Sequence, residues 1–252
     1  MASHALGRAG RLGLIVDIGG GTSDFSVFEA RDGKVRILAS HGIRLGGTDF
    51  DHAISLTHAM PHLGHGGQLR REFGGGLRPV PNAIFSDLAT WAKIPFLYAA
   101  DTRRNVAEMA QLAADPVTFG RLETVLSEEL GHELAFAVES GKISANTADG
   151  DGVIDMGFVE RGVTAAITAA SMNDALTKYR TDLHDAARET LQLADTAPDE
   201  IGTVVLVGGS SLMGMVTSEM QTLCPRAEMR QSEAFTAVVD GLALAAAGAF
   251  PR

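Results

Sequence analysis

One short stretch near the start of the chain constrains the fold and the chemistry more than any other. An apolar run over residues 14–18 is followed by Gly19, Gly20 and Gly21, and then by residues 23–28, in which apolar and polar side chains alternate. Val, Ile and Phe favour pleated strands, and glycine adopts positive φ angles at little cost. The stretch therefore predicts two strands joined by a tight turn. An ordinary hairpin, whose glycines serve only the turn, is the simplest alternative.

The residues around this turn suit phosphate chemistry. Three consecutive glycines leave backbone N–H groups without side chains in front of them, so a phosphate can approach closely. Asp17 before the turn and Asp24 after it supply two carboxylates, and hard oxygen ligands of this kind suit Mg²⁺ or its bound waters. Thr22 adds a hydroxyl where the turn ends. The stretch therefore predicts a site for phosphate and magnesium.

Composition and charge exclude several classes of protein. A chain of 252 residues can bury a proper core as one large domain or two small ones. Its formal net charge of −10, with no basic cluster, disfavours a nucleic-acid partner. Cys224 is the only cysteine, so an intramolecular disulfide is impossible and a reducing compartment is natural. No apolar run approaches the length of a membrane span, and no signal peptide precedes Leu12. We expect a cytoplasmic protein without a membrane partner, with residues 1–11 as a polar leader or a cloning remnant.

Hydrophobic periodicity and turn residues divide the rest of the chain into further elements. Strands are expected at residues 35–42, 153–158 and 203–207. Helices are expected after Gly47 through Ala59, and at residues 103–114, 117–145 (one long helix capped by Asp115), 163–194 (one or two helices), 212–223 and 232–249. Residues 61–95, rich in glycine and proline, are expected to be irregular. His58, His62 and His65 lack a carboxylate or cysteine at fixed spacing, so a metal site is disfavoured there.

Two further glycine turns deserve comparison with the first. Gly46 and Gly47 end the third strand, and taken alone they make a common strand-to-helix turn. Residues 203–207 run into Gly208, Gly209 and Ser210, which precede a helix. A helix N-terminus carries unpaired N–H groups and a positive dipole, so strand, glycine turn and helix together favour an anion or a nucleotide.

Four segments, taken in order, resemble motifs of the DnaK-type heat-shock chaperone ATPases, members of the actin/hexokinase/heat-shock superfamily. Residues 17–24 with residues 44–51 resemble the second phosphate motif of that family. Residues 139–144 resemble the helix segment that touches adenine and ribose, and residues 204–211 resemble the adenosine motif. The nearest group is the YegD-type chaperone-like proteins, which share a stretch similar to residues 60–67. The resemblance runs from about Leu12 to the end of the chain.

The resemblance implies a fold and a set of roles. The fold is an α/β lobe of the ribonuclease-H-like (actin-like ATPase) type, with a mixed five-stranded sheet flanked by helices over residues 12–252 and a helical insertion at about 61–145. Asp17, Thr22 and Asp24 are the implied catalytic residues: the two aspartates hold Mg²⁺ through water, and Thr22 helps to order the attacking water. The implied contacts to ATP or ADP come from Gly19, Gly20, Gly21, Gly46, Gly47, Glu139, Lys142, Gly208, Gly209 and Ser210. Without the family, Glu139 and Lys142 would make a solvated ion pair at i and i+3.

The chain also departs from the family pattern. Ile143, Asn146 and Leu212 stand where the family has two arginines and a serine near the base, so stacking on adenine is expected to be weaker or different. The first phosphate hairpin, its lysine and glutamate, and the β-rich peptide-binding domain have no counterpart. We therefore expect the second lobe alone, which binds weakly and hydrolyses negligibly without the first lobe. Protein clients and co-chaperones are the other expected partners.

Three functions remain open from the sequence. The leading hypothesis is the nucleotide-binding lobe of a heat-shock chaperone ATPase, active only within a longer protein. The first alternative is a pseudo-ATPase, a nucleotide-sensing or partner-binding scaffold without turnover. The second is a sugar or acetate kinase, or a polyphosphatase, of the same superfamily. Residues 44–51 favour the heat-shock branch over this alternative and over a filament-forming actin homologue.

Overall fold

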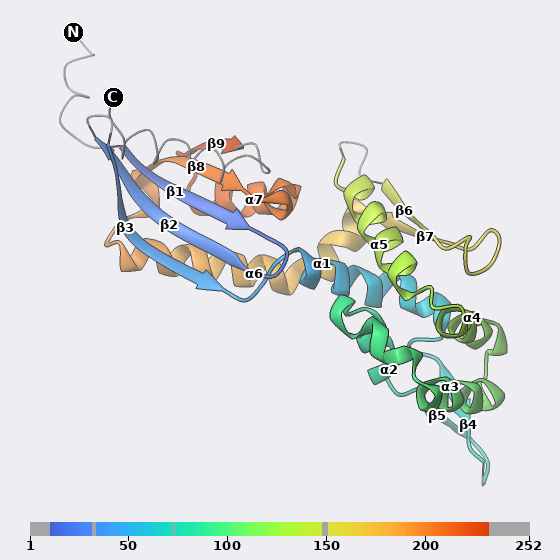
Figure 1. The fold of residues 1–252 in the computed structure, drawn as a ribbon. Coiled ribbons are helices and arrows are strands. Elements are labelled where there is room, and N and C mark those ends of the chain that lie inside the picture. Colours follow the sequence, from blue (N-terminus) through green and yellow to red (C-terminus); the bar gives the residue numbers. More distant parts are fainter. Residues whose placement is uncertain (1–10, 32–33, 73, 148–150, 232–252) are drawn as a thin grey trace, which may run out of the picture. The chain divides into compact units, whose positions relative to one another are not determined.

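A computed structural model describes residues 11–31, 34–72, 74–147 and 151–231, which form two compact units (Figure 1). The first, called the sheet unit here, comprises Met1–Gly47 and Lys178–Arg252. The second, called the helical unit, comprises Thr48–Thr177. The predicted leader lies outside the described residues, except that Arg11 begins the first strand, and the predicted helix 232–249 lies outside them as well.

The sheet unit contains one five-stranded mixed sheet in the order β3-β2-β1-β8-β9. β1 (Arg11–Ile18), β2 (Ser23–Arg31) and β3 (Lys34–Ile43) form an antiparallel meander. β8 (Ile201–Val207) runs parallel to β1, and β9 (Glu228–Gln231) runs parallel to β8. The predicted α/β fold with a mixed five-stranded sheet is therefore confirmed.

The central strand β1 lies between β2 and β8 in this sheet and contributes buried side chains to the core. Leu14, Val16 and Ile18 are fully buried, as expected for an apolar strand in the middle of a sheet. Gly13 lies opposite Phe28 in the register of β1 and β2, and a Cβ at Gly13 would collide with the Phe28 ring. The ring thus occupies the space that a side chain on β1 would need.

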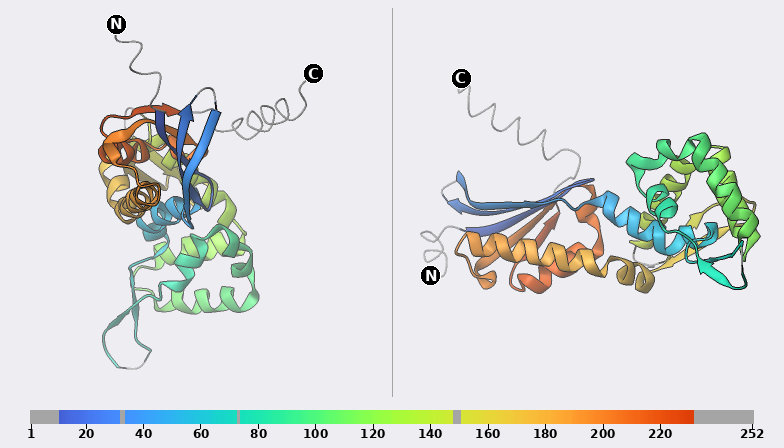
Figure 2. Two further views of the ribbon diagram at one scale, coloured as in Figure 1. Left: turned by 90° about the vertical axis from the view of Figure 1, so that its left-hand side faces the viewer. Right: turned by 90° about the horizontal axis from the view of Figure 1, so that it is seen from below.

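Two helices of the C-terminal half belong to the sheet unit and are joined to each other by a hydrogen bond. Within the sheet unit, α6 (Ala169–Leu193) runs along one face of the sheet, as Figures 1 and 2 show. The second helix, α7 (Gly214–Leu223), follows β8 after the short 3₁₀ turn η6 (Gly209–Leu212). Arg180 on α6 donates from Nε to Glu219 on α7 at 2.9 Å, which joins the two helices. A further short turn, η5 (Pro198–Glu200), leads into β8.

The helical unit is built from short helices and two small hairpins. Its elements are α1 (Gly47–Ile54), the π-helix η2 (Ser55–Ala59), η3 (Met60–Leu63), β4 (Gln68–Arg70), β5 (Leu77–Pro79), α2 (Ala83–Leu88), η4 (Trp91–Tyr98), α3 (Ala100–Leu112), α4 (Pro116–Ser127), α5 (Gly131–Ala145), β6 (Asp151–Asp155), β7 (Thr164–Thr168) and the start of α6. Phe50, Phe85 and Phe119 are fully buried and form part of its core. The predicted insertion at about 61–145 lies inside this unit; its limits as a subdomain stay a prediction.

The long helix predicted over residues 117–145 is wrong, because the chain forms two helices there, α4 and α5. The chain turns between them at Glu129, whose φ of 60° lies in the left-handed region. Tyr98 holds this turn: its hydroxyl donates to the Glu129 carbonyl oxygen at 3.0 Å and accepts from the Gly131 N–H at 3.0 Å. The predicted Asp115 cap of the first helix is confirmed, since its carboxylate accepts from the Val117 N–H at 3.1 Å.

Two other segments contain strands or helices that the sequence pattern did not predict. The start of the expected helical region 163–194 is the strand β7, which pairs antiparallel with β6 and buries Ala165 and Ile167 on one face. The expected irregular region 61–95 contains β4, β5, α2 and η4. Among the described residues, no helix is both long and apolar enough to span a membrane.

Candidate functional site

The glycine hairpin between β1 and β2 is present as predicted. Asp17 lies directly opposite Asp24 in the register, followed by Ile18 opposite Ser23. The Gly19 N–H donates to the Thr22 carbonyl oxygen at 2.9 Å, which leaves Gly20 and Gly21 at the tip. A Cβ on either tip residue would meet no atom within 4 Å, so the tip faces open space.

The second glycine turn packs directly against this hairpin. The Gly47 N–H donates to the Gly19 carbonyl oxygen at 3.0 Å. A Cβ on Gly46 would lie 2.6 Å from the Gly21 nitrogen and 2.7 Å from the Gly20 carbonyl carbon. These distances are shorter than van der Waals contact, and both atoms belong to the backbone. Gly46 is therefore required by the close approach of two backbone turns.

The third glycine turn, which follows β8, packs against the end of β1. Gly208 has a φ of +85°, and a Cβ there would collide with the Ile18 carbonyl oxygen and lie 2.8 Å from Asp17 Oδ1. A Cβ on Gly47 would collide with the Ser210 hydroxyl, so the second and third turns also touch. Three turns that are far apart in the sequence thus meet at one end of the sheet.

This meeting point lies at the C-terminal ends of two parallel strands. β1 and β8 run parallel with Asp17 opposite Val207, so Gly19 and Gly208 leave the sheet at the same edge. Open α/β sheets bind their ligands at this edge, where turns present backbone N–H groups. Gly209 is exposed and a Cβ there would meet no atom within 4 Å, so this part of the edge is open.

Two carboxylates accompany the three turns. Because Asp17 and Asp24 are cross-strand neighbours, their side chains lie on the same face of the hairpin. Burial raises the pKa of Asp17 above its ordinary value, and the negative charge of Asp24 raises it further. The Thr22 hydroxyl donates to Asp24 Oδ2 over a long 3.4 Å. All three predicted catalytic residues therefore lie around one turn.

The donor set fits a hydrated magnesium ion. Mg²⁺ commonly binds proteins through one or two carboxylates and takes its remaining ligands from water and substrate phosphates. A cation beside Asp17 and Asp24 would also relieve the repulsion that raises the pKa of Asp17. Among the described residues, no three or more His, Cys, Asp and Glu side chains are grouped so that they could hold a metal ion by themselves. His58, His62 and His65 therefore form no such group.

Glu139 and Lys142 lie on α5 in the helical unit, whereas the other predicted site residues lie in the sheet unit. Lys142 is buried, and its ammonium nitrogen lies 2.7 Å from Asp51 Oδ1. Burial raises the pKa of Asp51 above its ordinary value. Lys142 lowers this pKa through its positive charge and hydrogen bond, whereas the negative charge of Glu139 raises it. The ion pair of Lys142 is thus with Asp51 on α1. Asp51 was not among the predicted site residues, although it belongs to the segment 44–51 that carries the family resemblance. The apolar replacements Ile143 and Leu212 are 59% and 40% exposed.

A sheet in this order, with glycine turns and two carboxylates at the C-terminal edge of its parallel strands, has the fold of an actin-like ATPase lobe. A family model described as "Hsp70 protein" matches residues 8–64, which contain two of the three turns. The chain is 25% identical to "Chaperone protein DnaK" of Thermosipho africanus over 236 residues, which is 93% of this chain and 31% of that protein.

Other chaperones give the same result. The "Chaperone protein HscA homolog" of Methylibium petroleiphilum is 28% identical over 204 residues, which is 80% of this chain and 23% of that protein. "Chaperone protein dnaK" of Gracilaria tenuistipitata var. liui is 33% identical over 97 residues, or 35% of this chain. The chain is thus similar to DnaK-type heat-shock chaperones over most of its own length. It spans 31% of the length of the DnaK relatives that it matches over most of its own length.

Proposed function

We propose that this chain is the nucleotide-binding lobe of a chaperone ATPase, and that its sheet unit binds the phosphates of ATP or ADP with Mg²⁺. The observation that carries the proposal is the convergence of three glycine turns on two opposed carboxylates. Backbone turns without side chains suit a phosphate, and carboxylates beside them suit its counter-ion. The similarity to Hsp70 and DnaK chaperones supports the same conclusion.

Each residue of the site has a chemical role in this proposal. Gly20 and Gly21 at the open tip would let a phosphate approach the backbone of the hairpin. Asp17 and Asp24 would hold Mg²⁺ through its waters, and the ion would neutralise the phosphate charge. Thr22, between the tip and Asp24, would orient a water for attack on the terminal phosphate. Glu139 and Lys142 of the helical unit would contribute to the nucleoside, as the family resemblance implies.

Hydrolysis needs more than this lobe. Phosphoryl transfer depends on charge stabilisation on all sides of the transferred group. We therefore propose that ATP turnover, protein clients and co-chaperones belong to a longer protein that includes the first lobe, and that this chain alone binds nucleotide without hydrolysing it. The cytoplasmic location predicted from the single cysteine, and the nearness to the YegD-type group, stay predictions.

Calorimetric titration of the 252-residue chain with ADP, with and without Mg²⁺, tests the proposal. We expect weak binding that requires Mg²⁺. Asp17→Asn should reduce the Mg²⁺-dependent affinity about tenfold or more, because a hydrogen bond to a charged group, such as one from a Mg²⁺-bound water to the Asp17 carboxylate, contributes about 1.5–3 kcal/mol. Asp174→Asn, at an exposed position of α6 in the helical unit, is the matched control and should leave the affinity unchanged. Equal ADP affinity with and without Mg²⁺, in both the original chain and Asp17→Asn, would refute the assignment.

A pseudo-ATPase is the second candidate, and the exposed apolar side chains at Ile143 and Leu212 favour it. These positions cannot supply the cationic stacking on the base that an arginine supplies. If the base contributes nothing to binding, Mg²⁺-pyrophosphate should bind as tightly as Mg²⁺-ADP. A longer protein that binds ADP without turnover would support this candidate, whereas rapid ATP hydrolysis would exclude it. No observation favours the kinase or polyphosphatase alternatives.

A further inference from the structure

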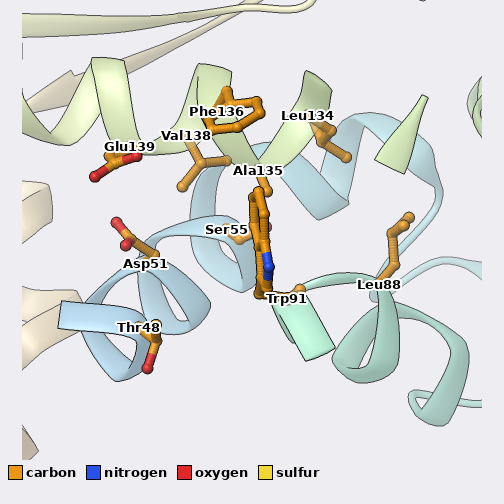
Figure 3. A pocket seen from close by; sticks show the side chains of 11 residues that line it. Thr48, Asp51, Ser55, Leu88, Trp91, Leu134, Ala135, Phe136, Val138 and Glu139 are labelled. Atoms are coloured by element: carbon orange, nitrogen blue, oxygen red, sulfur yellow. The ribbon is translucent and has the colours of Figure 1, made fainter. Parts of the chain in front are cut away.

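A cavity of about 330 Å³ opens in the helical unit, and its walls are mostly apolar. Figure 3 shows the indole of Trp91 and the ring of Phe136 among the side chains that line it. These two rings meet edge to face, with centroids 5.1 Å apart and planes inclined by 72°. Both rings are about half exposed, so they can contact a further group. A cavity of this size and lining is typical of a site for a small organic molecule.

The polar end of the cavity carries negative charge. Both ionisable side chains that line it within the described residues, Asp51 and Glu139, are carboxylates. In Figure 3 these carboxylates point toward one another from α1 and α5. Lys142 neutralises Asp51 through the ion pair at 2.7 Å. Glu139 is exposed and forms no salt bridge within the described part of the chain, so its charge remains available to a ligand.

Ser55 is a second, independent feature of this cavity. The residue is only 5% exposed and lines the cavity. Ser55 also begins the π-helix η2, and short π-helical turns are rare and frequently lie at functional sites. Its hydroxyl can donate or accept a hydrogen bond at the cavity wall.

We propose that this cavity binds a small organic cation with a flat apolar body. The apolar ring would lie against Trp91 and Phe136, where a cation is also attracted by the aromatic faces. The positively charged N–H groups would donate to the Glu139 carboxylate and the Ser55 hydroxyl, which both accept. The site lies wholly within the helical unit and needs no phosphate, so it is a different site from the glycine turns.

Benzamidine, benzamide and benzoate test this proposal, because they share one flat shape and differ in charge. Trp91 is the only tryptophan, so its fluorescence in the 252-residue chain reports events at the cavity directly. We expect a saturable change with benzamidine, binding about tenfold weaker for benzamide, and none for benzoate, since a charged hydrogen bond is stronger than a neutral one. N-acetyltryptophanamide controls for collisional quenching, and saturation-transfer NMR of the probe gives a second readout.

Matched variants separate the site from non-specific binding. Glu139→Gln should weaken the binding of benzamidine at least threefold and leave the binding of benzamide nearly unchanged. Glu133 is an exposed carboxylate on the same helix outside the cavity, so Glu133→Gln should change neither affinity. Phe136→Ala should weaken both ligands, whereas Phe96→Ala, another exposed phenylalanine, should not.

These experiments can also overturn the proposal. Equal affinity for benzamidine and benzoate, or no saturable response to benzamidine in either readout, would refute a cation site. An equal effect of Glu139→Gln and Glu133→Gln would refute its location. None of the three probes contains ribose or phosphate, so the result is independent of whether Glu139 also contacts a nucleotide.

Discussion

Replacing Gly46 with alanine tests the meeting of the glycine turns directly. The new methyl group would lie 2.6 Å from the Gly21 nitrogen, 2.7 Å from the Gly20 carbonyl carbon and 2.8 Å from the Gly19 carbonyl oxygen. All three are backbone atoms, so no side chain can rotate away and one of the two turns must move. Overpacking of this kind costs about 1–3 kcal/mol, and we expect about 3 kcal/mol here because nothing flexible can yield.

Gly20→Ala is the matched control, since it adds the same methyl group to the neighbouring turn. A Cβ at Gly20 meets no atom within 4 Å, and its φ is not positive. Alanine there should therefore leave the stability unchanged, or increase it by about 0.4–1 kcal/mol because it reduces the conformational entropy of the unfolded chain. The methyl group would point into the space where a phosphate is proposed to bind, so Gly20→Ala should instead weaken the binding of Mg²⁺-ADP.

Urea denaturation gives the measurement. With an m-value of about 3 kcal/mol/M, the Gly46→Ala midpoint for the sheet unit should fall by about 1 M in far-UV circular dichroism. The fluorescence of Trp91 follows the helical unit and should change less. If Gly46→Ala is as stable as the original chain, or Gly20→Ala loses as much stability, the two turns do not pack as described.

Three further outcomes follow from single contacts. Tyr98→Phe leaves the Gly131 N–H without its acceptor and should destabilise the helical unit by about 1–2 kcal/mol in Trp91-monitored urea denaturation. Since the pKa of Asp17 is raised, its protonated form is favoured by folding and its contribution to stability falls as pH rises through that pKa. Asp17→Asn should therefore stabilise the chain by about 0.2–1 kcal/mol at pH 7, because it removes a partly buried charge and its repulsion from Asp24, and the gain should shrink toward pH 4 in parallel urea titrations. Burial raises the pKa of Cys224 to about 11, so about one thiol in a thousand is ionised at pH 8, and a thiol reagent should modify it only after unfolding.

The elements of the sheet unit were predictable because their signals are local. The hairpin around Gly19–Gly21 combines strand-forming residues with a glycine turn, and both occur within a few positions of each other. The strand β8 and the turn that follows it have the same kind of local signature. The contact between the turns could not be predicted in this way, because the space beside Gly46 and Gly208 depends on residues distant in sequence.

The errors in the helical unit share one cause. Apolar residues repeat at helical spacing on both sides of Glu129, and periodicity alone therefore predicts a single helix across it. The break depends on Tyr98, which lies 31 residues before Glu129 and supplies hydrogen bonds on both sides of the turn. β7 was missed for a similar reason, since its threonines and alanines form a strand only because β6 pairs with it.

The cavity beside Trp91 also depends on tertiary structure, and this bears on how Glu139 and Lys142 should be interpreted. On the sequence they form one pair at helical spacing, but the structure gives them different surroundings. Lys142 is buried and paired with Asp51, whereas Glu139 is exposed at the rim of a cavity that no sequence motif marks. A buried lysine with a fixed partner is held in one position, while an exposed carboxylate can accept a ligand without breaking an ion pair. We therefore expect Glu139 and Lys142 to act separately: Lys142→Met should destabilise the helical unit by leaving Asp51 unpaired, and Glu139→Gln should affect ligand binding alone. Equal losses of stability in both variants, measured by Trp91 fluorescence in urea, would contradict this separation.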